Sequence, residues 1–271
     1  MNDGSLSVSI AEALAKYFDS KLRKSTKEVV ESDLEQCLED GVQLFKYLDD
    51  KDVFQKFYAR LLAKRLIYNL STSDDAEASA ITRLKNACGL EYTSKLQRMF
   101  TDMSVSQDLS VAFRDHIRAS ATNAIDTSVL VLTQGAWPMS QSQVMEVIIP
   151  EELEHSARAF TDFYQQRYNG RRLTWLHHLS KVEVRAWAFD KRYDLTVSIV
   201  QFLALLALNS TDVLSITTMA RDIKMSEPDL QRALKPLVEI KLLLQADTGY
   251  RLNFCFKKYA RLSYILLIPY C

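Results

Sequence analysis

The sequence predicts a mainly α-helical protein with a small α+β domain: a helical bundle, then an α/β block, then a winged-helix-like module. Three observations carry this prediction. Gly and Pro are few, 6 and 5 residues in 271, which is typical of helical folds rather than loop-rich or β-sandwich folds. Apolar residues recur at helical spacing through most of the chain. Between residues 123 and 198 the pattern changes to short β-branched runs bounded by Gly and Pro.

Helical periodicity dominates residues 1–122, where we expect a bundle with short connections. Expected helices cover residues 7–24, 33–48, 51–66, 74–88 and 93–118. The run Ser71-Thr72-Ser73 supplies N-cap residues for the fourth helix, and Gly89 stands where a left-handed C-cap is expected. Gly41 falls inside the second helix at a cost of about 1 kcal/mol relative to Ala. We therefore expect close packing at that position.

Residues 123–198 have the pattern of an α/β block. Strands are expected over residues 126–134, 144–149, 172–177, 182–189 and 193–198, and a helix over residues 151–168. The first of these strands precedes Gly135 and the second is stopped by Pro150. His177 and His178 fall at the end of a strand, where adjacent side chains face opposite ways. We therefore expect a solvated pair rather than two ligands of one metal.

Residues 199–254 outline a winged helix: three helices over 199–208, 215–221 and from 226 onward, then a hairpin over 242–254. Winged helices often bind DNA, so a DNA-binding regulator is one alternative function. A helix that enters a DNA groove is expected to be basic. In the third helix and just after it, three basic residues stand against three acidic ones: Arg232, Lys235 and Lys241 against Glu227, Asp229 and Glu239. This balance disfavours nucleic-acid binding.

Composition and motif content argue against several function classes. Lys+Arg and Asp+Glu both number 34, so the formal charge is zero and a dedicated nucleic-acid binder is not expected. The four cysteines have no CxxC spacing and indicate a reducing, intracellular compartment. No metal-spaced cluster, nucleophile motif or phosphate-binding loop occurs, so we expect no catalytic residues, no metal and no cofactor. We also expect no membrane span and no signal peptide.

Two runs in the bundle resemble a known family. DKDVFQKFYARLLAKRL (residues 50–66) and DDAEASAITRLKNACGLEYTSKLQRMF (residues 74–100) are similar to the centre of the cullin homology region, most of all in cullins of the SCF type. This resemblance implies a non-catalytic scaffold subunit of a RING ubiquitin ligase, acting in ubiquitin-dependent protein degradation. It also implies a cytoplasmic and nuclear location.

The resemblance continues in the α/β block, in VLVLTQGAWP (residues 129–138) and FYQQRYNGRRLTWLHHLSKVEV (residues 163–184). In cullins this block accepts an extended N-terminal segment of the RING-box protein as an extra strand. The resemblance implies that five residues line such a site here: Val129, Val131, Trp137, Leu173 and Trp175. The alternative, that Trp137 and Trp175 are core aromatics, stays open.

A basic cluster ends the first expected helix. Cations at a helix C-terminus complement the helix dipole and need no further explanation. However, DSKLRKSTK (residues 19–27) resembles the cullin pattern in which a basic cleft receives the acidic tail of a ubiquitin-conjugating enzyme. Arg23, Lys24 and Lys27 match that pattern. The resemblance thus implies a second, transient partner, and both explanations stay open.

The final residues depart from the family pattern. After residue 253 the sequence NFCFKKYARLSYILLIPYC lacks the further sheet, the long helix with a modified lysine and the second winged helix that cullins have. We expect a bundle at 1–122, a RING-partner-binding block at 123–198, a winged-helix-like module at 199–254 and a divergent tail at 255–271. On this basis the chain is expected to be a cullin fragment, with an inactive truncated cullin as a further alternative.

Overall fold

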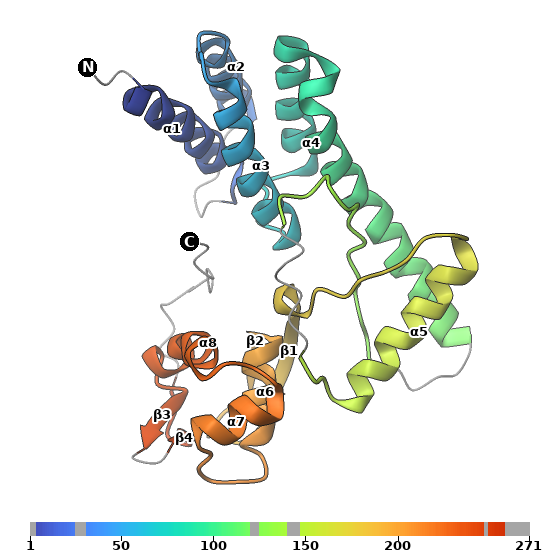
Figure 1. The fold of residues 1–271 in the computed structure, drawn as a ribbon, viewed down its shortest axis with the longest axis vertical. Coiled ribbons are helices and arrows are strands. Elements are labelled where there is room, and N and C mark those ends of the chain that lie inside the picture. The colour runs from blue at the N-terminus through green and yellow to red at the C-terminus, as the bar shows by residue number, and fades with distance from the viewer. Residues whose placement is uncertain (1–3, 25–30, 120–124, 140–146, 247–248, 258–271) are drawn as a thin grey trace. The chain divides into compact units, whose positions relative to one another are not determined.

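A computed structural model describes residues 4–24, 31–119, 125–139, 147–246 and 249–257 (Figure 1). The chain divides into two compact units, residues 1–140 (unit 1) and residues 141–271 (unit 2). Each unit has its own apolar core among the described residues. The predicted fold class, mainly helical with small antiparallel sheets, is confirmed.

The described part of unit 1 contains four long helices: α1 (Gly4–Leu22), α2 (Glu31–Lys46), α3 (Lys51–Ile67) and α4 (Asp74–Ala119). The predicted helices are therefore confirmed, with ends that differ by a few residues. Four aromatic side chains form the centre of the core, and contacting rings lie 4.8–5.8 Å apart between centroids: Phe18, Phe45, Phe54 and Tyr58. All four are fully buried, as the apolar spacing predicts.

The structure explains why glycine occurs at two positions of unit 1. A Cβ atom on Gly41 in α2 would lie 2.9 Å from the ring of Phe18, so the buried Phe18 ring packs against the position that a larger side chain would occupy. Gly89 has φ 85° and ψ 173°, which interrupts α4 after its first 15 residues. At the start of α4 the Ser73 hydroxyl accepts the Ala76 N–H at 3.1 Å, so the expected cap is confirmed.

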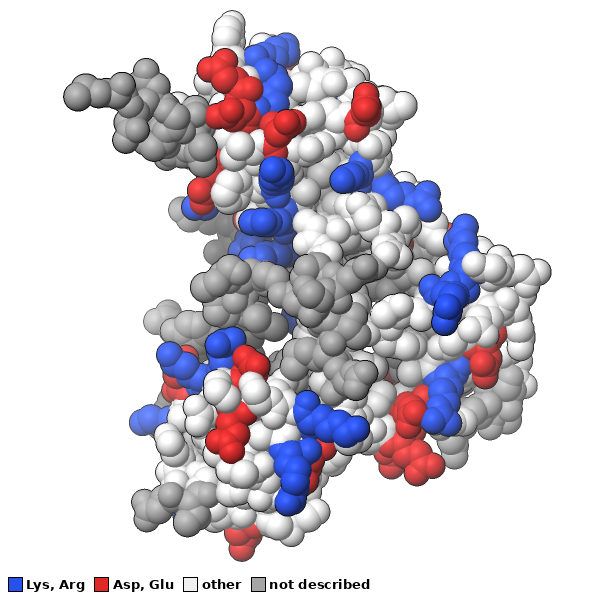
Figure 2. Space-filling view, in the orientation of Figure 1, with Lys and Arg blue, Asp and Glu red and all other residues white. Residues whose placement is uncertain are grey.

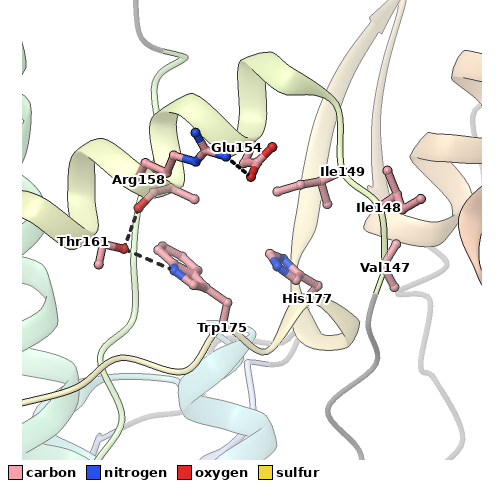
Figure 3. Close-up of a pocket in the computed structure, with 9 residues that line it drawn as sticks. Val147, Ile148, Ile149, Glu154, Arg158, Thr161, Trp175 and His177 are labelled. Atoms are coloured by element: carbon pink, nitrogen blue, oxygen red, sulfur yellow. Dashed lines mark hydrogen bonds and ion pairs between the residues drawn. The ribbon is translucent and has the colours of Figure 1, made fainter.

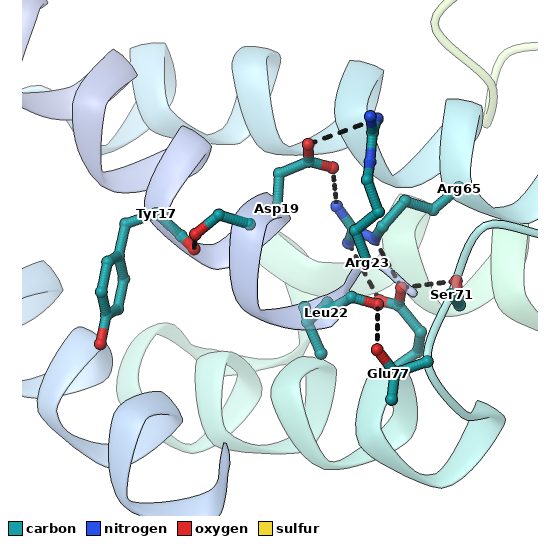
Figure 4. A network of polar contacts seen from close by, with 9 residues as sticks. Tyr17, Asp19, Leu22, Arg23, Arg65, Ser71 and Glu77 are labelled. Carbon is teal, nitrogen blue, oxygen red and sulfur yellow. Dashed lines mark hydrogen bonds and ion pairs between the residues drawn. The ribbon is translucent and has the colours of Figure 1, made fainter. Parts of the chain in front are cut away.

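A buried arginine ties three parts of unit 1 together (Figure 4). Arg65 in α3 has no exposed side-chain surface and donates to both carboxylate oxygens of Glu77 in α4, at 2.6 and 3.0 Å. It also donates to Asp19 in α1 at 2.6 Å, and Ser71 donates to Glu77 at 2.7 Å. Burial alone lowers the pKa of Arg65, but its bonds to Glu77 and Asp19 outweigh burial and raise that pKa.

The strand predicted at residues 126–134 is wrong, because this segment pairs with no other strand in the described structure. It runs instead along the second half of α4 (Figure 1), and its backbone bonds to side chains of that helix. Asp102 in α4 accepts the Thr133 N–H at 2.7 Å and the Trp137 indole N–H at 2.8 Å. Side chains of a helix thus replace the expected neighbouring strand.

Unit 2 begins with α5 (Glu151–Arg167) and a two-stranded antiparallel sheet of β1 (Lys181–Ala186) and β2 (Tyr193–Ser198). In its register Lys181 faces Ser198 and Ala186 faces Tyr193. These three elements were expected from the sequence. The strand predicted at 172–177 is wrong: residues 171–176 are irregular, and a 3₁₀ turn follows at His177–Leu179. The strand predicted at 144–149 is absent from its described part, residues 147–149, and residues 144–146 lie outside the described residues.

Three helices and a hairpin follow in the described part of unit 2: α6 (Ile199–Ala207), α7 (Ile216–Ile223), α8 (Glu227–Glu239), β3 (Leu243–Ala246) and β4 (Gly249–Leu252). Leu214 pairs with Tyr250 through two backbone hydrogen bonds of 2.9 and 3.0 Å. A Cβ on Gly249 would meet the Leu214 carbonyl oxygen at 2.2 Å, which explains glycine there. The elements occur in the predicted order, and their assignment as a winged helix stays a prediction.

On the face shown in Figure 2, lysine and arginine side chains alternate with aspartate and glutamate in small groups. This distribution agrees with the equal numbers of acidic and basic residues in the sequence. None of the helices in the described ranges combines the length and the apolar character that crossing a membrane requires.

Candidate partner-binding site

A pocket of about 390 Å³ lies within unit 2 (Figure 3). Three segments surround the pocket: residues 147–149, helix α5, and the segment from Trp175 to His177. Its lining combines apolar and aromatic side chains with four polar or charged ones: Val147, Ile148, Ile149, Ala157 and Trp175 with Glu154, Arg158, Thr161 and His177. Such a lining is typical of a site for an apolar or peptide ligand.

Residues on α5 fix the polar groups of the pocket. Arg158 pairs with Glu154 one helical turn earlier at 2.5 Å, and this ion pair is largely exposed. The Thr161 hydroxyl accepts the indole N–H of Trp175 at 3.3 Å, while it donates to the Ala157 carbonyl at 2.8 Å. The indole is therefore held by one specific bond to the helix.

Packing between aromatic rings holds Trp175 in place at one wall of the pocket. The ring of Trp175 meets the buried ring of Phe160 edge to face at 6.1 Å and stacks on His177 at 6.2 Å with an angle of 7° between the planes. Burial lowers the pKa of His177, and burial with the neighbouring His177 lowers the pKa of His178. The expectation that the two histidines form a solvated pair is wrong, because both are half-buried and the Nδ1 atom of His178 is buried.

Both chain segments beside the pocket lack regular secondary structure and are unpaired. Within the described residues, no backbone hydrogen bond joins residues 147–149 or residues 171–175 to any other segment. Residues 147–149 have the β-branched, apolar sequence of a strand, whereas residues 171–175 combine two arginines with Leu173, Thr174 and Trp175. Their backbone N–H and C=O groups are thus available to a further extended chain.

The five residues predicted to bind a RING partner are divided between the two units. Leu173 and Trp175 are half-buried in unit 2, and Trp175 lines the pocket. In unit 1, Val129 and Trp137 are buried at 8% and 6% exposure, and Val131 is half-buried. Trp137 belongs to the core of unit 1, as the alternative explanation holds. The binding role of all five residues stays a prediction.

Sequence reasoning missed most of the pocket. Ile148, Arg158 and Thr161 were not among the expected site residues, although they line it with Trp175. Arg158 and Thr161 stand three residues apart and so share one face of α5, which is a usable signal. No local pattern indicates that this face meets residues 147–149 and 175–177.

The basic cluster is partly engaged by its own unit. Arg23 pairs with Asp19 at 3.5 Å, and the ammonium of Lys24 donates to the carbonyl and side-chain oxygens of Asn69 at 3.0 and 3.1 Å. Lys24 remains exposed. Lys27 lies outside the described residues. Arg23 and Lys24 thus make contacts at the end of α1 within the bundle. An acidic partner protein for them stays a prediction.

Two other site types find no support in the described structure. No group of three His, Cys, Asp or Glu side chains among the described residues could hold a metal ion. On α8, Arg232 pairs with Asp229 at 3.2 Å and Lys235 with Glu239 at 3.9 Å. These internal pairs leave little free positive charge for phosphate groups.

Comparison with known proteins agrees with these observations. Residues 1–110 match the family model described as the cullin alpha solenoid domain, and residues 131–257 match the cullin alpha+beta domain. Cullin-1 of Dictyostelium discoideum is 43% identical over 238 residues, which is 86% of this chain and 31% of that protein. Cullin-1 of Schizosaccharomyces pombe is 44% identical over 239 residues, 87% of this chain and 31% of that protein.

More distant members match over the same extent. Cullin-4A of Mus musculus is 37% identical over 242 residues, 88% of this chain and 32% of that protein. The chain therefore spans about a third of the length of the curated relatives that it matches. Since two cullin domain models together match most of its residues, the chain belongs to the cullin family.

Proposed function

We propose that this chain acts as a non-catalytic scaffold in a cullin-RING ubiquitin ligase, and that unit 2 binds the extended N-terminal segment of a RING-box protein. Membership of the cullin family supports the scaffold role. One observation supports the binding mode: two segments without backbone partners in the described ranges flank a pocket of about 390 Å³ within the residues that match the cullin alpha+beta domain.

Strand addition is the binding mode that the two unpaired segments beside the pocket favour. An added strand satisfies the free backbone groups of both segments, while its alternate side chains enter pockets that give specificity. Here Trp175, Ile149 and the exposed Ile148 offer the apolar surface for such side chains. Ile148 is 51% exposed, so its side chain is accessible to a partner at the pocket.

The test is retention of a RING-box protein by the full chain carrying Ile148→Glu. A glutamate placed in a dry strand interface has no partner for its charge, so we expect retention to fall at least about 10-fold. Surface plasmon resonance with the purified RING-box protein measures the change. Removing the N-terminal segment of the RING-box protein is expected to have the same effect.

Ile240→Glu is the matched control. Ile240 is also an exposed isoleucine of unit 2, at 42%, but it lies at the end of α8 and does not line the pocket. We expect this variant to bind the RING-box protein as the unchanged chain does. Equal affinity of the Ile148→Glu and Ile240→Glu variants for the RING-box protein would disprove the proposed binding site.

We also propose that the basic cluster in unit 1 steers a ubiquitin-conjugating enzyme with an acidic tail. The support is the exposed Lys24, whose ammonium is oriented by Asn69, together with the resemblance of residues 19–27 to the cullin pattern. The double variant Lys24→Glu, Lys27→Glu is expected to slow association with such an enzyme about 10-fold at low salt. The difference is expected to shrink as salt screens the charges.

A second double variant separates position from net charge. Lys85→Glu with Lys95→Glu makes the same change of charge at two exposed sites on α4. Stopped-flow association rates at low salt are expected to stay near those of the unchanged chain in this control. If both double variants slow association equally, the cluster has no special role.

A further inference from the structure

Two adjacent histidines form part of one wall of the pocket in unit 2. His177 lines the pocket, and its ring stacks on that of Trp175 at 6.2 Å with 7° between the planes (Figure 3). His178 follows it and is half-buried, and its buried Nδ1 atom makes no hydrogen bond in the described structure. The segment from Trp175 to Ser180 is therefore built in part on imidazole rings that are shielded from water.

This burial suits the neutral form of His178. A neutral imidazole carries a single N–H, which Nε2 can hold, so Nδ1 needs no acceptor. A protonated ring carries an N–H on both nitrogens, and a buried Nδ1–H without an acceptor is costly. Burial accordingly lowers the pKa of both imidazoles, and the neighbouring His177 lowers the pKa of His178 further. Stacking on Trp175 favours a charged ring at His177, so His178 is the stronger sensor of pH.

The elements packed around the two rings offer no free negative charge. On α5, the ionisable residues that line the pocket are Glu154 and Arg158, and they pair with each other at 2.5 Å. Helix α6, which packs against the turn His177–Leu179, and residues 147–149 contain no ionisable side chain. Among the described residues that line the pocket, no carboxylate is thus left to pair with an imidazolium at His178.

The chain on either side of the two rings is mainly positive. Arg171 and Arg172 come before the rings, and Lys181 comes after them. Glu183 lies two residues further on, on the exposed face of β1. Positive neighbours disfavour a further positive charge, so these flanking residues also favour neutral imidazoles.

Few bonds hold this segment in place. Within the described residues, two hydrogen bonds join residues 175–180 to other segments. The indole N–H of Trp175 donates to the Thr161 hydroxyl at 3.3 Å, and the Ile199 N–H donates to the Ser180 carbonyl at 3.1 Å. A segment with so few bonds to its surroundings opens locally at a small cost in free energy.

Proton linkage sets the direction of the effect. An imidazole that opening exposes to water has an ordinary pKa of about 6.5, whereas the closed segment holds that pKa lower. Above about pH 6.5 neither state binds the proton, so the closed state keeps its full stability. Below that pH the open state binds the proton first, so each histidine shifts the equilibrium toward opening by up to about 10-fold per pH unit.

We propose that His178, assisted by His177, makes this wall of the pocket a pH-sensitive switch. At about pH 7.5 the neutral rings pack in place, and Trp175 closes the pocket against α5. In mildly acidic solution protonation favours the open segment, and the pocket loses the wall that Trp175 forms. The switch is a property of the free chain, so it does not depend on which ligand the pocket binds.

Hydrogen exchange of the full 271-residue chain tests the switch. Peptides that cover residues 171–181 are followed by mass spectrometry at about pH 7.5 and about pH 5.5, with rates corrected for the intrinsic effect of pH on exchange. We expect the opening equilibrium of this segment to rise about 10-fold in the acidic sample, because the open state alone binds the proton of one histidine. His178→Gln removes the titrating group and is expected to abolish most of that rise.

His155→Gln is the matched control, because His155 is an exposed histidine of α5 that does not line the pocket. It is expected to keep the full rise. Labelling with 5-fluorotryptophan adds a readout at Trp175, whose ¹⁹F resonance is the one that Trp175→Phe removes. That resonance is expected to change in step with exchange, while the resonance of Trp137, which is buried in unit 1, stays unchanged.

Three results would overturn the proposal. The first is exchange of residues 175–180 that does not rise in acid in the unchanged chain, a result that needs no variant. The second is an equal rise in the His178→Gln and His155→Gln variants. The third is an equal rise in peptides of α8, which would show acid destabilisation of all of unit 2 rather than a local switch. RING-box binding is measured at about pH 7.5, where the segment is closed, so the two proposals fail independently.

Discussion

Replacing Arg65 with methionine is expected to destabilise unit 1 by about 3–5 kcal/mol, because it leaves buried carboxylates without their cation. Arg65 holds Glu77 through two bonds and Asp19 through a third, and the side chains of Arg65 and Glu77 have no exposed surface. Methionine fills a similar volume, so the loss reflects charge rather than packing. Native-state hydrogen exchange followed by mass spectrometry measures unit 1 separately from unit 2.

Two further variants define the cause. Arg118→Met removes an exposed pair with Asp115 on α4 and is expected to cost less than about 1 kcal/mol. Arg65→Met combined with Glu77→Leu removes both partners and is expected to recover part of the loss. If Arg65→Met costs no more than Arg118→Met, the buried network contributes nothing to stability.

Replacing Asp102 with alanine is expected to cost about 3–5 kcal/mol and to release the segment that follows α4. The carboxylate accepts the N–H of Thr133 at 2.7 Å, its hydroxyl at 2.9 Å and the indole N–H of Trp137 at 2.8 Å. Its removal leaves three donors without an acceptor, and each buried unpaired donor costs about 1–3 kcal/mol unless water reaches it. Hydrogen exchange of unit 1 measures the loss of stability.

Iodide quenching of tryptophan fluorescence should rise in the same variant as Trp137 becomes accessible, since Trp137 is only 6% exposed in the native fold. Asp102→Asn keeps one oxygen acceptor and is expected to have an intermediate effect. Asp108→Ala removes an exposed carboxylate from the same helix and serves as the control. Similar effects of Asp102→Ala and Asp108→Ala would show that the buried carboxylate does not anchor the segment.

The helices were predictable because their signals are local. Apolar spacing identified α3, the Ser73 cap marked the start of α4, and Gly89 marked its interruption. Each signal lies within a few residues of the feature that it determines. The arginine network was not predictable in this way, because Arg65, Glu77 and Asp19 come from three distant positions and a charged residue is usually expected at the surface.

The strands were predictable only where the partner is adjacent in the sequence, as in β1 and β2. Residues 126–134 have a strand composition, but the partner they found is a row of serine and aspartate side chains on α4. Residues 147–149 and 171–175 form no backbone hydrogen bond to another segment among the described residues. Composition thus specified an extended conformation, whereas pairing depended on contacts between distant residues.

The candidate site was predictable in part. Trp175 was expected from the family resemblance and does line the pocket, while Ile148, Arg158 and Thr161 were not expected. A pocket depends on how α5 packs against two irregular segments, and no periodic pattern describes irregular segments. Trp137 was expected at the same site but belongs to the core of the other unit.

The interruption at Gly89 also divides the helical backbone of α4 into two runs. An uninterrupted helix of 46 residues would extend about 69 Å and would gain and lose its hydrogen bonds cooperatively along that length. With φ at 85° and ψ at 173°, Gly89 breaks the sequence of helical residues. The run of helical backbone is therefore interrupted between residues 90–119, which hold the segment 126–134, and residues 74–88, which carry Glu77. The two halves still share one apolar core, because Leu84 from the first half and Leu96 and Met99 from the second belong to the same cluster of buried side chains; side-chain packing rather than a continuous helix therefore couples them.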